Sequence, residues 1–186
     1  MYLIIIEGTD NIGKDTLINE LIKLFNSVTL IHCNSPKAKC FQSYEQDNTF
    51  IQYARNIVNG YYDETDVIIM NRSHIGEYVY GQLYRNRSQE AIEDMINKVD
   101  GILLNREDLV IKYVQLLSSS VELRKKYDDN LSLSNVDDEL MKKENELFLE
   151  AFENSPLEKQ LIYVNDEDNF LPKEEIYNDV VKFINE

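Results

Sequence analysis

The sequence predicts an α/β fold, in which a parallel sheet of five strands is the middle of three layers and helices cover both of its faces. Short apolar runs alternate along the chain with amphipathic stretches whose apolar residues recur at helical spacing. Such alternation is typical of parallel sheets, because each parallel connection needs a long crossover that a helix usually supplies. The length of 186 residues suits one well-buried core and is too short for two ordinary domains, so we expect a single domain over residues 1–186.

Five apolar runs are the expected strands, and they comprise residues 1–6, 28–33, 67–70, 109–116 and 160–164. The first and third runs contain almost no polar residues, which is typical of strands buried on both faces. Amphipathic patterns predict helices over residues 16–25, 50–59, 75–84, 88–99, 136–152 and 174–184. Open parallel sheets bind ligands beyond the carboxyl ends of their strands, so the residues that follow Ile6, Cys33 and Met70 are the first candidates for function.

Composition excludes several classes of function. The chain has 34 acidic and 19 basic residues, and we expect no nucleic acid polymer as a partner because phosphate backbones require a basic surface. The opening apolar run ends at Glu7, far short of a signal sequence or a membrane span, so we expect no membrane association. Cys33 and Cys40 are too few for a disulfide framework or a metal cluster, which indicates a reducing compartment and a cytoplasmic protein.

A glycine-bearing segment follows the first expected strand. Residues 8–16 read Gly-Thr-Asp-Asn-Ile-Gly-Lys-Asp-Thr and fit the pattern G-x-x-x-x-G-K, so we call them the phosphate loop. Gly8 and Gly13 allow tight wrapping, backbone N–H groups of the loop and the following helix face the phosphates, and Lys14 neutralises charge on the β- and γ-phosphates. The residues expected to bind ATP are Gly8, Asn11, Ile12, Gly13, Lys14, Asp15 and Thr16.

The phosphate loop departs from the pattern at Asp15, where Ser or Thr is expected. That hydroxyl ordinarily binds Mg²⁺, and a carboxylate can still bind the ion directly or through water, although it adds negative charge beside the phosphates. Mg²⁺ is therefore the expected metal, with Asp15 and Thr16 as its expected ligands.

A second informative segment, residues 71–81, follows the third expected strand and reads Asn-Arg-Ser-His-Ile-Gly-Glu-Tyr-Val-Tyr-Gly. Arg72 at the carboxyl end of a strand suits the binding of a second phosphate, because its guanidinium offers paired donors beside the phosphate loop. His74 and Glu77 lie at helical spacing, but no further side chain completes an acid/base pair or a metal site. We interpret them as residues whose polar groups are satisfied within the fold or face solvent.

Both segments resemble thymidylate kinases. Residues 7–10, Glu-Gly-Thr-Asp, are similar to the Glu-Gly-x-Asp pattern that leads into the phosphate loop of that family. The Gly-Lys-Asp-Thr of residues 13–16 resembles a variant found in some phage-type deoxynucleoside monophosphate kinases. Residues 71–81 match the family's Asp-Arg-aromatic and Ala-Tyr-Gln stretch at Arg72 and Tyr80. The resemblance spans most of the chain and implies a P-loop kinase fold with a small lid.

The resemblance also implies how the acceptor is bound. Asp10 would bind the sugar 3′-hydroxyl of the acceptor, Arg72 would hold its phosphate, and Tyr80 would line the nucleoside pocket. The expected helix over residues 50–59 is similar to the stretch that reads the base, and the side chains implicated are Phe50, Gln52 and Arg55. An ordinary amphipathic helix, with Phe50 in the core and Arg55 in water, remains an equal alternative.

The end of the second expected strand separates two kinds of acceptor. Deoxynucleoside kinases carry a glutamate there as the base for a 5′-hydroxyl, whereas residues 32–37 read His-Cys-Asn-Ser-Pro-Lys without a carboxylate. A monophosphate already carries an ionised nucleophile and needs positive charge instead, which Lys37 would add to Arg72. Lys37 is equally compatible with a solvated loop.

Thymidylate kinases place a mobile basic residue either in the phosphate loop or in a lid after the fourth strand. Asn11 removes the first option, so Arg124 is the expected lid residue, at the start of a polar lid over approximately residues 124–137. A helix whose charged residues simply meet water is the alternative. The expected catalytic residues are then Lys14, Arg72 and Arg124.

These inferences predict ATP- and Mg²⁺-dependent phosphorylation of a deoxynucleoside monophosphate to the diphosphate, with dTMP as the favoured substrate. Family members are commonly dimers, which implies a homodimer. Two alternatives stay open, a deoxynucleoside kinase that acts on a 5′-hydroxyl and a nucleotide-sensing protein in which Asp15 and Asn71 mark lost catalysis. The preferred base and the identity of the lid residue are not determined by the sequence.

Overall fold

The computed structural model describes residues 1–33, 42–127, 137–166 and 169–186. Its centre is a five-stranded parallel sheet with the strand order β2-β3-β1-β4-β5. The strands are β1 (Tyr2–Gly8), β2 (Val28–His32), β3 (Val67–Asn71), β4 (Val110–Leu117) and β5 (Lys159–Tyr163). All five lie where the sequence predicts them, with every end within two residues, and the predicted α/β fold is confirmed.

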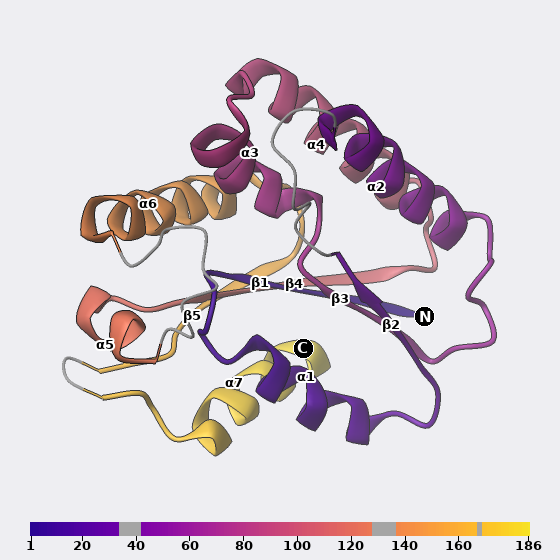
Figure 1. Ribbon diagram of the computed structural model, residues 1–186. Helices are drawn as coiled ribbons and strands as arrows, with labels where there is room; N and C mark the ends of the chain where they lie inside the picture. The colour runs from indigo at the N-terminus through magenta and orange to yellow at the C-terminus, as the bar shows by residue number, and fades with distance from the viewer. Residues whose placement is uncertain (34–41, 128–136, 167–168) are drawn as a thin grey trace.

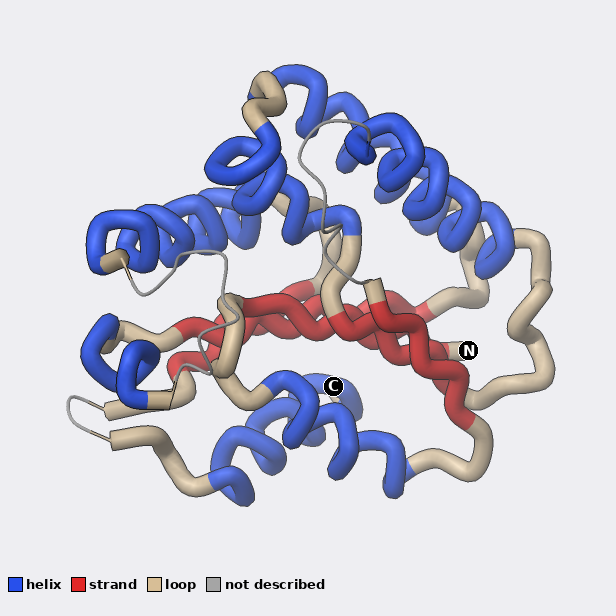
Figure 2. Tube along the Cα trace, viewed as in Figure 1, coloured by secondary structure: helices blue, strands red, loops and turns tan. Residues whose placement is uncertain are grey.

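Helices cover both faces of the sheet, so the fold has three layers (Figures 1 and 2). One face carries α1 (Lys14–Leu21) and α7 (Lys173–Asn185), which contact each other. The opposite face carries α2 (Gln42–Val58), α3 (Glu77–Arg85), α4 (Gln89–Leu104) and α6 (Asp138–Asn154). The short α5 (Val121–Lys126) follows β4, and the 3-10 turns η1 (Ile22–Leu24) and η2 (His74–Gly76) complete the described elements.

The central strands are buried on both faces, as their unbroken apolar runs predict. Along β1, Leu3 and Ile5 pack into the cluster beneath α2, α3, α4 and α6, while Ile4 and Ile6 pack into the cluster beneath α1 and α7. All four side chains have no solvent exposure. Full burial of each side chain contributes roughly 1.5–3 kcal/mol to the stability of the fold relative to exposure. The strand that leads into the phosphate loop is therefore strongly stabilised by packing on both faces.

The structure differs from the sequence expectations mainly at helix ends. The helix expected from residue 50 begins at Gln42, and the helix expected to end at residue 99 continues to Leu104. The additional first turns of α2 contain mostly polar residues, and two of these, Gln46 and Asp47, bind side chains that follow η2 and α3. Tertiary contacts rather than local periodicity thus extend this helix. Among the described residues, no helix is long and apolar enough to cross a membrane.

Candidate active site

The phosphate loop turns tightly between β1 and α1. Gly8 has a φ of +150° and Gly13 a φ of +94°, both in the region that side chains disfavour. A Cβ at Gly8 would lie 2.6 Å from the backbone oxygen of Leu116, so no larger residue fits against β4. Asn11 also adopts a left-handed conformation, with a φ of +57°. The loop therefore has the tight backbone path that wrapping around a phosphate requires.

Lys14 is buried at the start of α1, and its ammonium group folds back over the loop. Nζ donates to the backbone oxygen of Gly8 at 3.0 Å and to that of Thr9 at 2.5 Å. Burial and the nearby charge of Arg72 lower the pKa of Lys14 to about 7, although Asp10 opposes the shift. A bound phosphate would favour the charged form of this lysine.

Two positions at which this chain departs from the usual residues are in contact: Asp15, where the loop pattern has Ser or Thr, and Asn71, where the thymidylate kinase stretch has Asp. Asn71, the last residue of β3, donates from Nδ2 to Oδ1 of Asp15 at 2.6 Å. The same amide nitrogen lies 3.3 Å from Nδ1 of His32 at the end of β2. In the described part of the chain, no group of three or more His, Cys, Asp or Glu side chains is arranged to hold a metal. Mg²⁺ often binds through one or two carboxylates together with substrate phosphates and water, so a site of this kind fits Asp15.

Three residues that the resemblance implicates in acceptor binding are in direct contact. Arg72 donates from Nη1 to the hydroxyl of Tyr80 at 2.7 Å and forms an ion pair with Asp10. Its Cζ also lies 5.0 Å from the centroid of the Tyr80 ring. The guanidinium is therefore held between the phosphate loop and α3, and about a fifth of the Arg72 side chain is exposed.

Arg72 adopts a left-handed backbone conformation with a φ of +66°. This costs a non-glycine residue roughly 1–2 kcal/mol, and surrounding contacts have to stabilise it. The Arg72 backbone N–H donates to the oxygen of Ile6 at 3.0 Å, which ties the turn to β1. Backbone strain of this kind at a cationic residue often marks a functional site.

Glu7 is a site residue whose role sequence reasoning did not identify. Its Oε1 accepts hydrogen bonds from the backbone N–H and the hydroxyl of Ser73, at 2.6 and 2.8 Å, and from the N–H of Gly76 at 3.2 Å. Burial raises the pKa of Glu7, and Arg72 opposes the shift. Its signals in the sequence were its place at the end of an apolar strand and its position as the first residue of the Glu-Gly-x-Asp pattern. The partners that it binds, far along the chain, were not evident.

The predicted base-reading residues of α2 are divided between its two faces. Phe50 is buried, and its ring meets the ring of His74 edge-on at 6.3 Å. Gln52 and Arg55 are exposed, and Gln52 donates to the side chain of Asn56 at 2.7 Å. The roles of all three remain predictions. Lys37 lies outside the described residues.

A further glutamine occupies the inner face of α2, one turn before Phe50. Gln46 donates from Nε2 to Oε1 of Glu77 at 2.7 Å, and its own Oε1 is buried with no hydrogen-bond partner among the described residues. Glu77 also forms ion pairs with Arg85 and Arg87. His74 is buried against Asp100, with 2.7 Å between Nε2 and Oδ1. His74 and Glu77 thus bind separate partners, and both are satisfied within the fold, one of the two interpretations made from the sequence.

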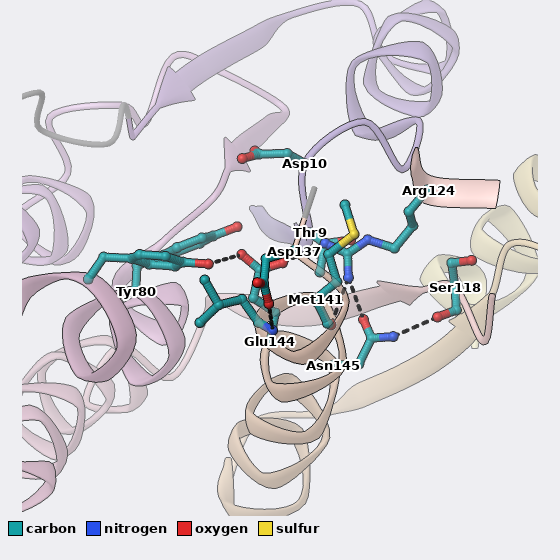
Figure 3. Close-up of polar contacts among 12 residues, drawn as sticks. Thr9, Asp10, Tyr80, Ser118, Arg124, Asp137, Met141, Glu144 and Asn145 are labelled. Atoms are coloured by element: carbon teal, nitrogen blue, oxygen red, sulfur yellow. Dashed lines mark hydrogen bonds and ion pairs between the residues drawn. The ribbon is translucent and has the colours of Figure 1, made fainter. Parts of the chain in front are cut away.

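Arg124 is buried at the end of α5 and points toward α6 (Figure 3). Its guanidinium donates to Oε2 of Glu144 at 2.5 Å, to the backbone oxygen of Met141 at 2.9 Å and to Oδ1 of Asn145 at 3.3 Å. Tyr84 donates to the other oxygen of Glu144 at 2.7 Å. In this conformation Arg124 is bound to α6 rather than to water. Its catalytic role remains a prediction, and most of the expected lid, residues 128–136, lies outside the described residues.

A pocket of about 280 Å³ opens beside the phosphate loop, next to α1 and α7. Most of its lining is apolar and aromatic, and includes Ile12, Leu17, Leu116, Val164, Phe170 and Tyr177. Tyr127, which follows α5, also lines it, and its ring lies 5.2 Å from that of Phe170. Such a pocket beside a phosphate loop suits a flat heterocycle attached to the phosphates.

No protein-family model matches the chain, and neither does any curated protein. Similar solved structures include the YorR protein of Bacillus subtilis, described in complex with phosphorylated GDP. It is 20% identical, with a TM-score of 0.71, over 98% of this chain and 95% of that one. Thymidylate kinase from Ehrlichia chaffeensis is 16% identical with a TM-score of 0.58, over 98% of both chains. Thymidylate kinase from Candida albicans is 15% identical with a TM-score of 0.62, over 98% of this chain and 90% of that one.

The chain has the three-layer α/β fold of P-loop kinases. YorR and both thymidylate kinases share this fold, so the resemblance seen in the sequence is confirmed at the level of the fold. Identities of 20% or less do not carry substrates or residue roles from those proteins to this one. Those roles have to be argued from the site itself.

Proposed function

We propose that this protein transfers the γ-phosphoryl group of ATP to a deoxynucleoside monophosphate, with dTMP or a related pyrimidine nucleotide as the acceptor. The observation that carries the proposal is the contact of Asp10, Arg72 and Tyr80 beside the phosphate loop. A loop for one set of phosphates and an arginine for another are what a reaction between two nucleotides needs.

Arg72 is the residue proposed to bind the acceptor phosphate. Its partners Asp10 and Tyr80 hold the guanidinium in place before the acceptor arrives, and they leave about a fifth of the side chain exposed. A dianionic phosphate competes well with a carboxylate and a phenol for these donors, because charge-assisted paired hydrogen bonds are the stronger ones. Asp10 would then be released to bind a sugar hydroxyl.

The donor is proposed to lie across the phosphate loop, with its base in the apolar pocket. Lys14 would turn from the carbonyl oxygens of Gly8 and Thr9 toward the phosphates, where its charge is better compensated. Mg²⁺, when bound, would neutralise negative charge on the β- and γ-phosphates, and Asp15 and Thr16 are the residues proposed to hold it.

The chemical step needs no general base. An oxygen of the acceptor phosphate is already ionised, so its lone pair forms the new bond to the γ-phosphorus while the bond to the bridging oxygen of ADP breaks. The charge of Arg72 reduces the repulsion between the two anionic reactants. Arg124 is proposed to add charge at the transferring group, which requires that it leave Glu144.

Coupled ADP release tests the proposal. ATP and Mg²⁺ are supplied with dTMP, dCMP, dUMP, dGMP or dAMP, and in parallel with the matching nucleosides. GMP is added because the similar YorR protein was described with phosphorylated GDP. Turnover with a monophosphate and none with nucleosides is the expected result. Turnover with nucleosides alone would identify a deoxynucleoside kinase, and nucleotide binding without any turnover would identify a sensing protein.

A further inference from the structure

The contact between Asp15 and Asn71 joins the two positions at which this chain departs from the usual residues of a P-loop nucleotide kinase. In P-loop enzymes a Ser or Thr follows the loop lysine and binds Mg²⁺, and an acidic residue at the end of a neighbouring strand helps to hold the ion. Here the loop position carries the carboxylate, and the strand position carries the neutral amide. The carboxylate and its neutral partner have exchanged places.

We propose that Asp15 is the carboxylate through which this protein holds the metal ion of its nucleotide, and that Asn71 is a positioning residue that orients it. This inference rests on one part of the proposed function, namely that the phosphate loop binds a nucleotide together with a divalent cation. It states which residue supplies the carboxylate for that cation, and it does not depend on which acceptor is used.

The geometry of the pair supports these roles. The hydrogen bond of 2.6 Å from Asn71 occupies Oδ1 of Asp15, which leaves Oδ2 available to an ion or to one of its water ligands. Asn71 is 8% exposed, whereas Asp15 is exposed on the first turn of α1. A buried amide that holds one oxygen of an accessible carboxylate is the usual arrangement of an oriented metal ligand.

His32 lies beside the same end of the Asn71 amide as the Asp15 carboxylate. Its Nδ1 lies 3.3 Å from Nδ2 of Asn71, so the amide nitrogen can donate one hydrogen to Asp15 and the other to a neutral imidazole. If the amide were rotated by half a turn, its oxygen would face the carboxylate, and two acceptors would meet. The contact with Asp15 therefore determines the orientation in which Asn71 supports it, and His32 accommodates this orientation when Nδ1 is its unprotonated ring nitrogen.

Charge balance removes the objection that Asp15 adds negative charge beside the phosphates. The usual arrangement has one carboxylate and one hydroxyl at these two positions, and this chain has one carboxylate and one amide. The number of negative charges close to the ion is therefore the same. The ammonium of Lys14, next in sequence, is within the same loop.

A double substitution that restores the usual arrangement is the sharpest test. The variants are Asp15→Ser, Asn71→Asp and the double variant Asp15→Ser/Asn71→Asp. Each is held with equimolar ADP at protein concentrations that keep nearly all ADP bound, and Mn²⁺ is titrated in. Free Mn²⁺ is measured by electron paramagnetic resonance, which needs no turnover. ADP affinity in EDTA and thermal unfolding are the controls for an intact loop and fold.

We expect Asp15→Ser to weaken Mn²⁺ binding to the ADP complex by about 10- to 100-fold, the usual effect of removing a ligand or its supporting group. Asn71→Asp alone should also weaken it, because the new carboxylate would face Asp15 at hydrogen-bond distance and repel it from its present orientation. The double variant should recover most of the wild-type affinity. Asn19→Asp, an added carboxylate at an exposed position of α1, should have little effect.

Two results would overturn the inference. The first is wild-type Mn²⁺ affinity in Asp15→Ser, and the second is a double variant no better than the single ones. If the unaltered protein bound no ADP, both this inference and the proposed kinase function would be wrong. A protein that binds Mn²⁺ through Asp15 but phosphorylates no monophosphate would leave this inference standing and refute the function.

Discussion

Glu7 and Ser73 lie 66 residues apart in the sequence and are joined by two hydrogen bonds, from the backbone N–H and from the hydroxyl of Ser73 to the same carboxylate oxygen. The bonds connect the end of β1 to the turn that carries Arg72. Since β1 leads directly into the phosphate loop, this buried carboxylate links the two segments of the proposed site.

We expect Glu7→Gln to fold but to lose roughly 1–3 kcal/mol of unfolding free energy, because a charged acceptor of several buried hydrogen bonds is replaced by a neutral one. The turn that positions Arg72 should loosen, so the KM for the monophosphate should rise more than the KM for ATP. Urea unfolding and steady-state kinetics measure these effects. Glu122→Gln, at an exposed position of α5, is the control. Equal changes in both KM values would argue against a link to Arg72.

Arg72→Lys should keep the positive charge and lose the paired donors that reach Asp10 and Tyr80. The loss of one or two charge-assisted hydrogen bonds predicts a decrease in kcat/KM for the monophosphate of about 10- to 100-fold. The same change at Arg106, an arginine that binds Asp108 shortly before β4, should leave kcat/KM for the monophosphate unchanged. An unaffected Arg72→Lys enzyme would show that the acceptor phosphate lies elsewhere.

Two glycine substitutions should have opposite effects on stability. Gly8→Ala places a Cβ 2.6 Å from the backbone oxygen of Leu116, at a residue whose φ is +150°. The substitution should therefore lower the unfolding free energy by at least about 1–3 kcal/mol and impair nucleotide binding. Gly101 lies within α4, where an added Cβ meets no atom within 4 Å. Gly101→Ala should therefore stabilise the protein by about 0.5–1 kcal/mol through helix propensity. Thermal unfolding of both variants is the measurement.

The lowered pKa of Lys14 predicts that the unfolding free energy and ADP binding depend on pH. Folding lowers this pKa from its ordinary value of 10.5 to about 7, so between these values the unfolded chain binds more protons. The contribution of Lys14 to the unfolding free energy should therefore rise with pH across this interval. Bound phosphates favour the charged lysine, so ADP binding near pH 8 should take up a proton.

Calorimetry in buffers of different ionisation enthalpy measures that proton uptake. Lys14→Met should abolish it, whereas Lys23→Met, at an exposed position in η1, should not change it. Proton release on ADP binding, or an uptake that persists in Lys14→Met, would contradict the assignment to this lysine.

Glu144 forms an ion pair with the buried Arg124, so replacing Glu144 should lower the unfolding free energy. Glu144→Ala leaves the guanidinium of Arg124 buried without its carboxylate and should reduce the unfolding free energy by about 3–5 kcal/mol. Glu146→Ala, an exposed neighbour on α6, should change it by less than about 0.5 kcal/mol. Chemical denaturation distinguishes the two. Similar values for both variants would mean that Arg124 is readily solvated and therefore mobile.

The strands and the phosphate loop were predictable because their signals are local. An unbroken apolar run such as residues 3–6 reports burial on both faces, and the loop motif is contiguous in the sequence. The first turns of α2 were missed because Gln46 and Asp47 are stabilised by partners on α3 and in the turn that follows it. Local patterns do not contain such contacts.

The candidate site was predictable to a similar extent. Asp10, Arg72 and Tyr80 were identified one by one from motifs, and the structure brings them into contact. Glu7 was quoted only as part of a motif, and Glu144 only as part of a helix, because a buried carboxylate has no pattern of its own. Arg124 was expected in a mobile lid, and its pairing with α6 depends on how two helices pack.

The strand order divides the residues of the proposed site between two parts of the chain, one on each side of β1. β1 lies between β3 and β4. The elements from β2 to α4 are therefore on one side of β1, and those from β4 to α7 are mainly on the other. Phe50, Arg72 and Tyr80 come from the first part, whereas the apolar pocket is completed by the second. Under the proposed function, mutations that alter the choice of acceptor would accumulate in one continuous stretch of the gene. Those that alter the choice of donor would fall in two others, one for the phosphate loop and α1 and one for the chain from β4 to α7. Either preference would be free to evolve while the other is kept.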